Sequence, residues 1–377
     1  MAHPSACRDG SRLVDSQTET RRLIRIAACI AFLLVPAGAA LAADDIGPKF
    51  TTFDGPGTGT TPYEGTFGIS INNAGTIAGY YSVDEVEHGF SRSPDGTITS
   101  FDPPGSSSTA ALGINNAGEI TGWCVEGGQF EGFVRAANGT RTTFGAPGAG
   151  AGSQQGTLAY SINEAGAVTG YYVDAGNVNH GFVRSPTGGI STFDAPGAGH
   201  DTYEGTQAYS INAAGVIAGQ YEDVSKVSHS FVRAADGEIT AFDAPGAGTA
   251  GGQGTDAWSV NAAGVIAGYY VDAAYTLHGF VRAANGTITD FNVPGIEQAV
   301  AQSINAAGII AGYAFGTDFV SHGFVRAAGG LTTTFNAPGA GWGESEGTVG
   351  NSINDAGSIA GTYTDASFVY HGFVLTP

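Results

Sequence analysis

The sequence predicts an all-β fold, a seven-bladed β-propeller with four antiparallel strands per blade. The first observation is a pattern, [I/V]-N-x-x-G, that recurs at spacings of 43 to 49 residues. Its asparagines are Asn72, Asn115, Asn163, Asn212, Asn261, Asn305 and Asn354. The second is that each repeat holds four short apolar stretches between glycine-rich turns, without helical periodicity. The third is that the two ends of the repeat region are complementary half-repeats, which indicates a ring.

The half-repeats predict how the ring closes. The chain ends in HGFVLTP, a third stretch with no fourth stretch after it, whereas KFTTFDGPG at 49–57 is a fourth stretch with no third before it. Joined, they make one complete repeat. We therefore expect the N-terminal strand to pair with the C-terminal blade, with Phe53 facing Phe373.

Side-chain size along the repeat predicts the order of the strands in a blade. The first stretch carries a small residue in every copy, which suits the crowded axis of a propeller. These residues are Gly68, Ala111, Ala159, Ala208, Ala257, Ala301 and Gly350. The third and fourth stretches carry two phenylalanines 11 residues apart, such as Phe90 and Phe101. Turn pairs such as Asp95-Gly96 predict type I′ hairpins that set the two rings directly opposite each other, with the fourth strand at the rim.

The first 42 residues differ from the rest and predict a secretory signal. Arg21, Arg22 and Arg25 precede an apolar run at 26–35, and Ala40-Leu41-Ala42 offers the small residues that a signal peptidase needs. We expect cleavage near Ala42, a single propeller domain at 43–377, and a secreted or periplasmic location. The Sec and twin-arginine routes both remain open. No later stretch is long enough for a transmembrane helix.

Charge and cysteine content exclude several classes of protein. The formal net charge is −20 at pH 7, which argues against nucleic-acid and anionic-membrane partners because both reward Lys and Arg. Residues 43–377 contain a single cysteine, Cys124, so no disulfide can form within them. Cys124 follows Trp123 where other repeats have Tyr, which indicates packing better than a nucleophile. We expect a monomer.

The consensus INxxGxIAGYY, HGFVR and GTITxFDAPG resembles the HAF-type extracellular repeat of secreted bacterial proteins. The resemblance covers nearly all of 43–377, although the name-giving tripeptide His-Ala-Phe is mostly His-Gly-Phe here. Glu131 replaces His in the second copy and Ser230 replaces Gly in the fourth. The resemblance implies an extracellular repeat domain and no particular reaction.

A histidine recurs at one slot, preceded by an aspartate four or six positions earlier. The pairs are Asp84 and His88, Asp174 and His180, Asp223 and His229, Asp272 and His278, Asp318 and His322, and Asp365 and His371. Asp and His can bind metal or act as acid and base. Six equal pairs favour a structural hydrogen bond in each blade, and we expect neither a metal nor another cofactor.

Positions that break the repeat are better candidates for a binding site. In blades three to five the first strand carries Tyr160, Gln207, Tyr209, Asp256 and Trp258, followed by Gln302 and Asn351 in blades six and seven. One interpretation is an aromatic and polar platform for sugars or peptides near the channel mouth. The other is packing between blades.

The loops that join successive blades also vary, and they contain His200 and Tyr203 as further binding candidates. Two classes of function follow. The first is a binding or scaffold propeller that presents an acidic, aromatic loop face to an extracellular glycan, peptide or surface partner. The alternative is an extracellular hydrolase or lyase acting on a polysaccharide, with His200, Asp201 and Glu204 as acid and base candidates.

Overall fold

The computed structural model describes residues 48–377, and the predicted signal at 1–42 lies outside this part of the chain. The described residues form strands and turns only. No helix among them is long and apolar enough to cross a membrane.

The strands repeat in units of four, each strand antiparallel to the next along the chain. The first strands are β2 (Thr66–Ile71), β6 (Ser108–Ile114), β10 (Gly156–Ile162), β14 (Gly205–Ile211), β18 (Gly254–Val260), β22 (Gln298–Ile304) and β26 (Gly347–Ile353). The second strands are β3 (Ile77–Val83), β7 (Ile120–Glu126), β11 (Val168–Val173), β15 (Ile217–Glu222), β19 (Ile266–Val271), β23 (Ile310–Phe315) and β27 (Ile359–Thr364).

The outer strands complete the units. The third strands are β4 (Val86–Arg92), β8 (Gln129–Arg135), β12 (Asn179–Arg184), β16 (Ser228–Arg233), β20 (Leu277–Arg282), β24 (Ser321–Arg326) and β28 (Tyr370–Thr376). The fourth strands are β5 (Ile98–Phe101), β9 (Arg141–Phe144), β13 (Ile190–Phe193), β17 (Ile239–Phe242), β21 (Ile288–Phe291), β25 (Thr332–Phe335) and β1 (Lys49–Phe53). We number the units from β2–β5 as unit 1 to β26–β28 with β1 as unit 7.

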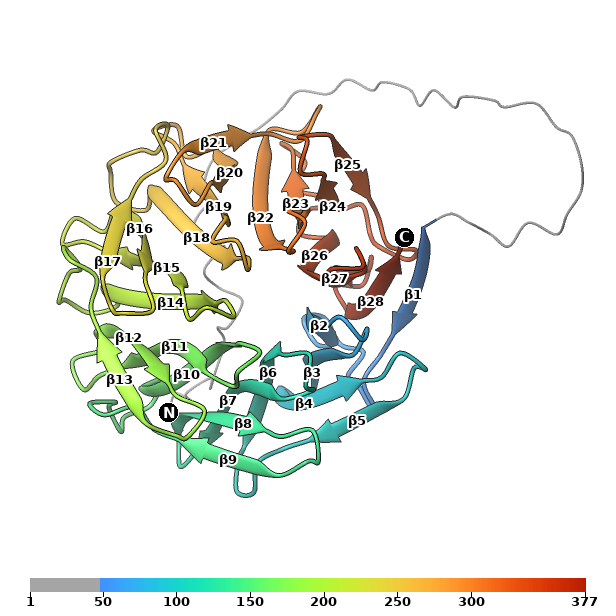
Figure 1. Ribbon diagram of the computed structural model, residues 1–377. Coiled ribbons are helices and arrows are strands. Elements are labelled where there is room, and N and C mark those ends of the chain that lie inside the picture. The colour runs from blue at the N-terminus through green and yellow to red at the C-terminus, as the bar shows by residue number, and fades with distance from the viewer. Residues whose placement is uncertain (1–47) are drawn as a thin grey trace, which may run out of the picture.

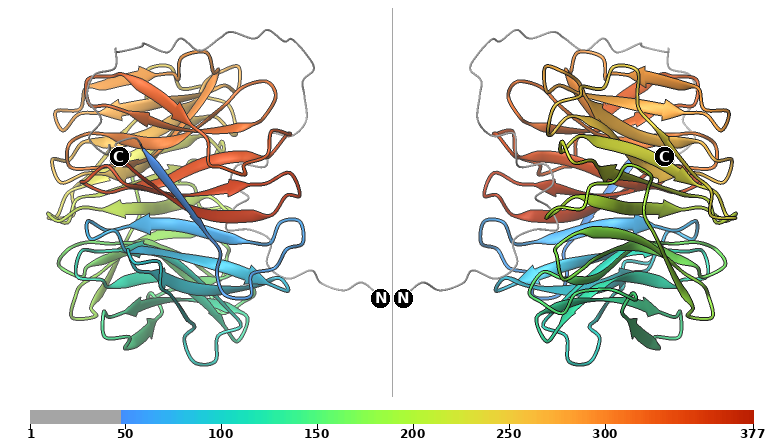
Figure 2. Two further views of the ribbon diagram at one scale, coloured as in Figure 1. Left: turned by 90° about the vertical axis from the view of Figure 1, so that its right-hand side faces the viewer. Right: turned by 90° about the vertical axis from the view of Figure 1, so that its left-hand side faces the viewer.

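The units stand around a common axis, with the first strands innermost and the fourth strands at the periphery (Figure 1). First strands of neighbouring units contact each other, and β2 contacts both β6 and β26. Figure 2 shows β1 beside β28, and the two strands pair antiparallel over the whole of β1. Two faces result. We call the one with the loops that enter the first strands the loop face, and the one with the Asn-x-x-Gly turns the turn face.

The predicted phenylalanine register is wrong by one residue. Phe101 lies opposite Gly89, Phe90 lies opposite Ser100, and the same shift sets Phe53 opposite Gly372 instead of Phe373. The turn explains the shift. Ser93 N–H bonds to Thr97 O, and only the last of the three loop residues, Gly96, has positive φ (93°). This is a three-residue loop with a G1 bulge, and the extra residue turns the two rings to opposite sheet faces.

The shifted rings hold neighbouring units together instead. Each fourth-strand phenylalanine packs edge to face on the third-strand phenylalanine of the next unit, with ring centroids about 6 Å apart. An arginine of the next unit covers its other side, as Arg92 covers Phe53 at 4.8 Å. Unit 7 has Leu375 at the arginine position, and Phe50 of β1 packs on Phe335 and Phe373 there. The aromatic core therefore lies between units.

The recurring asparagine does more than start a turn. Its Oδ1 accepts a hydrogen bond from the backbone four residues later, as between Asn72 and Thr76 N–H (2.9 Å). Its Nδ2 donates to the backbone carbonyl of the equivalent asparagine in the next unit, at 3.0 to 3.1 Å. The series returns on itself, because Asn354 donates to Asn72 O. We call these seven residues the asparagine ring. It surrounds the axis at the turn face.

Candidate functional site

Five of the predicted binding residues lie on the first strands of units 3 to 5, which are innermost around the axis, and we call them the channel group. Tyr160 and Tyr209 lie edge to face at 5.4 Å, and Tyr209 stacks on Trp258 at 4.7 Å with an interplanar angle of 6°. Tyr209 Oη donates to Gln207 Oε1 at 2.7 Å. Tyr209 is 5% exposed. Its ring and its hydroxyl are therefore already occupied by protein groups.

Two of these aromatic side chains stand at β-bulges in the first strands. The pairing of β14 with β15 skips Tyr209, and that of β18 with β19 skips Trp258, so each is an extra residue at a β-bulge. Gln302 and Asn351 occupy the same bulge in units 6 and 7. Asn351 Nδ2 donates to Gly68 O at 2.9 Å, which joins unit 7 to unit 1. Tyr209, Trp258, Gln302 and Asn351 therefore occupy the same bulge position of their units.

Asp256 supplies the carboxylate of the channel group. It is 6% exposed, and its Oδ1 has no hydrogen-bond partner within residues 48–377. Burial raises the pKa of the Asp256 carboxyl to about 7, and hydrogen bonds from Tyr269 and Ser228 oppose that rise only in part. The carboxyl therefore changes protonation near neutral pH.

The other two predicted residues, His200 and Tyr203, lie on the loop face and are exposed. The Tyr203 side chain is 63% exposed, and its backbone adopts φ of 68°, a region that bulky residues rarely occupy. Tyr203 N–H bonds to Asn177 O, which ties the loop of unit 4 to the turn of unit 3. The structure thus separates the predicted site into a channel group and a loop-face group.

The loop face carries further exposed aromatic side chains. Tyr63 is 65% exposed and Trp342 is 67% exposed, in the loops equivalent to that of Tyr203. Tyr275, in the turn between β19 and β20, is also exposed, and it adopts positive φ like Tyr63. Sequence reasoning missed Tyr275, although the same turn position is aromatic in units 6 and 7, where it holds Phe319 and Phe368.

Glu204 has a structural role in its loop. It is buried, its Oε2 accepts from Asp201 N–H at 2.9 Å, and its Oε1 lies 3.3 Å from Lys226 Nζ. The Asp201 N–H bond is the main cause that lowers the Glu204 pKa, with a smaller contribution from Lys226. Glu64 and Glu346 hold their own loops in the same way. A carboxylate that stays ionised cannot serve as the general acid of a hydrolase.

The recurring histidines are clamped between strand and loop. His180 Nδ1 lies 2.8 Å from Asp194, the residue after the fourth-strand phenylalanine, and Nε2 lies 3.5 Å from Asp174. Both nitrogens are likewise engaged in units 4, 5 and 7. His88 and His322 keep only the downstream partner, Asp102 and Asn336, and the predicted pairs with Asp84 and Asp318 do not form. The partner 14 residues downstream was missed, although the FDAPG pattern contains it.

These contacts give a prediction about pH. The hydrogen bond with Asp54 is the main cause that raises the pKa of His371, so its stabilising contribution is complete below about pH 6.5 and is lost as pH rises through the raised value. We expect His371→Gln to lower the free energy of unfolding by about 1 kcal/mol at pH 6 and by less at pH 8. Urea unfolding at both pH values measures it. An equal loss of unfolding free energy at pH 6 and pH 8 would show that the charge of His371 does not contribute to stability.

Unit 2 lacks the histidine of the clamp and also its downstream partner, since Gly145 follows Phe144. Glu131 stands at the histidine position, and Cys124 faces it across the strands where most units have tyrosine. Cys124 is fully buried, and burial raises the pKa of its thiol to about 12. A buried, protonated thiol packs as a small apolar side chain. Cys124 therefore belongs to the core.

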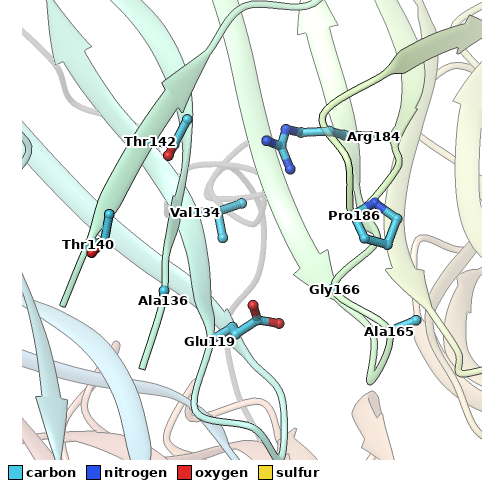
Figure 3. A pocket seen from close by; sticks show the side chains of 9 residues that line it. All are labelled: Glu119, Val134, Ala136, Thr140, Thr142, Ala165, Gly166, Arg184 and Pro186. Carbon is cyan, nitrogen blue, oxygen red and sulfur yellow. The ribbon is translucent and has the colours of Figure 1, made fainter. Parts of the chain in front are cut away.

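Two of the cavities on the described part of the molecule bear on the site. One, of about 200 Å³, lies between units 2 and 3, with Glu119 and Arg184 on its two sides (Figure 3). Both groups are engaged, since Glu119 accepts from Asn115 Nδ2 and Arg184 covers Phe144. The other, of about 280 Å³, is bounded by the asparagine ring. Within residues 48–377 no three His, Cys, Asp or Glu side chains are arranged to hold a metal ion.

Comparison with known proteins shows the fold. No protein-family profile and no curated protein matches the chain. Virginiamycin B lyase from Staphylococcus aureus has a similar structure, with 13% identity and a TM-score of 0.57, over 88% of this chain and 100% of that one. BP39L lectin from Burkholderia pseudomallei has 10% identity and a TM-score of 0.53, over 82% and 95%.

A third similar structure is the β-propeller domain of the Trilobed protease from Pyrococcus furiosus. It has 10% identity and a TM-score of 0.51, over 84% of this chain and 94% of that one. At such identities the likeness concerns the fold alone, and the chain is an all-β protein with a β-propeller fold. One fold that serves a lyase and a lectin does not select a function.

Proposed function

We propose that the protein is a secreted, seven-bladed β-propeller that binds a glycan on its loop face without transforming it. The predicted signal at 1–42 and the resemblance to HAF-type repeats support export. Closure into a ring is supported by the pairing of β1 with β28 and by the hydrogen bond from Asn354 to Asn72 O. Each unit is then one blade, and the chain acts as a monomer.

The observation that carries this proposal is the set of exposed aromatic side chains on one face. Tyr63, Tyr203 and Trp342 are each about two-thirds exposed, in three of the loops that enter the blades. Tyr63 and Tyr203 sit at positive φ, where Asn or Gly costs less, so something other than local conformational preference accounts for them. Exposed aromatic rings stack on the apolar faces of sugars, and neighbouring carboxylates accept from hydroxyls.

The loop-face residues suit a binding site better than the channel residues do. Tyr203 offers a free ring, whereas the faces of Tyr209 are covered by its neighbours. The lectin among the similar structures fits a glycan-binding role for a propeller of this kind. The alternative hydrolase or lyase has weaker support, because Glu204 is committed to its loop.

A glycan array tests the proposal. Tyr203→Ala and Trp342→Ala should each weaken binding of the glycan found by about fivefold or more, since such an anchor contributes about 1 kcal/mol. Leu331→Ala removes an equally exposed apolar side chain from a turn on the other face and should leave binding unchanged. Trp258→Ala should lower the melting temperature instead. Binding that is indifferent to both loop-face variants would contradict the proposal.

A further inference from the structure

The cavity at the turn face has a second ring of hydrogen bonds that is incomplete. Residues directly after the recurring asparagines form its rim, namely Asn73, Asn116, Glu164, Ala213, Ala262, Ala306 and Asp355. In four units the backbone N–H of the rim residue donates to the side chain of the next rim residue. The bonds run from Ala306 to Asp355 (2.9 Å), Asp355 to Asn73 (2.9 Å), Asn73 to Asn116 (2.8 Å) and Asn116 to Glu164 (3.1 Å).

In the other three units the acceptor is missing. The N–H groups of Glu164, Ala213 and Ala262 would need an oxygen from the next rim residue, but that residue is alanine in each case. In the described chain none of these three N–H groups has a hydrogen-bond acceptor. They are consecutive around the rim. The structure thus leaves an arc of three unpaired backbone donors at one side of the cavity.

The remaining walls restrict the ligand. The carboxylates of Glu164 and Asp355 flank the arc, and each can accept bonds beyond those it already takes. Seven apolar residues line the inner wall, each only 5 to 8% exposed, namely Ile71, Ile114, Ile162, Ile211, Val260, Ile304 and Ile353. The volume of about 280 Å³ lies just below the usual range for ligand sites, which begins at about 300 Å³. An occupant therefore needs acceptors, donors and an apolar face within a small volume.

We infer that the cavity at the turn face binds one neutral pyranose ring, at a site separate from the loop face. Sugar hydroxyls both accept and donate, so they can bond to the three N–H groups and to the flanking carboxylates together. The apolar face of the ring would lie on the Ile and Val side chains. Two flanking carboxylates and a net charge of −20 disfavour an anion as the occupant.

The rim residues Asn73 and Asn116 suggest a variant that tests this inference. The triple variant Ala213→Asn, Ala262→Asn, Ala306→Asn supplies the missing acceptors as Asn73 and Asn116 do in their units. It should close the rim, keep or raise the melting temperature, and weaken binding of methyl glycosides of glucose, galactose and mannose by about tenfold or more. Saturation-transfer NMR at millimolar glycoside measures this. Ala214→Asn, Ala263→Asn, Ala307→Asn is the control, because these exposed residues share the turns but do not line the cavity.

Two outcomes would overturn the inference. If the wild-type protein binds the glycosides and the rim-filled variant binds them equally, the three N–H groups are merely hydrated. If acetate gives a saturation-transfer signal and no glycoside does, the occupant is a carboxylate. Tyr203→Ala, measured with the same glycosides, keeps the two proposals apart. It should leave this site intact even if the loop-face proposal fails.

Discussion

A chain that begins at Gly55, and therefore lacks β1, is expected to lose on the order of 5 kcal/mol of folding free energy and to aggregate. Phe53 packs on Phe90 and is covered by Arg92, and Phe50 packs on Phe335 and Phe373. Without β1 these contacts disappear and β28 becomes an unpaired edge. Chemical unfolding and size-exclusion chromatography measure the two effects.

Point variants separate the aromatic contribution from that of strand pairing. Phe53→Ala should cost about 3 kcal/mol, because it opens a cavity between two units. Lys49→Ala, in the same strand with an exposed side chain, should change stability by no more than about 0.5 kcal/mol. A truncated chain that stays monomeric with an unchanged melting temperature would contradict the role of β1 in closing the fold.

The sequence predicted the parts of this fold that depend on local pattern. Repeat period, alternating apolar stretches and glycine turns gave four strands per repeat, and the two half-repeats predicted the pairing of β1 with β28. The register of the outer hairpins failed because Asp95-Gly96 is compatible with both a two-residue and a three-residue loop. One residue of loop length decides which face a side chain occupies.

The arrangement of the candidate site depends more on contacts between units, and the repeat pattern does not reveal such contacts. The Nδ2 partner of each recurring asparagine is a backbone carbonyl in another unit, so sequence reasoning found the turn and missed the ring. The three acceptors missing from the rim correspond to Ala213, Ala262 and Ala306, and nothing in the sequence pattern singled out these alanines. Tyr209 and Trp258 were predicted on neighbouring first strands, and their mutual stacking became visible only in the structure.

The stability of the protein should fall with rising pH because of one buried carboxyl. In the unfolded chain the Asp256 pKa lies near 3.9, and in the folded chain burial raises it to about 7. Between these values the folded state binds more protons than the unfolded state, so folding free energy is lost as pH rises. Above the folded value the loss is complete, at about 4 kcal/mol.

Asp256→Asn removes this titration while keeping the size of the side chain. The difference in unfolding free energy between the variant and the wild type should therefore grow in favour of the variant from about pH 4 to about pH 8, by up to about 4 kcal/mol. Any fixed cost of burying an amide beside Tyr269 shifts the whole curve and leaves its slope unchanged. Asp201→Asn, at an exposed loop position, controls for the change in net charge. A difference that stays constant across that range would mean that the Asp256 carboxyl is hydrated in solution, because the penalty arises from its burial away from water.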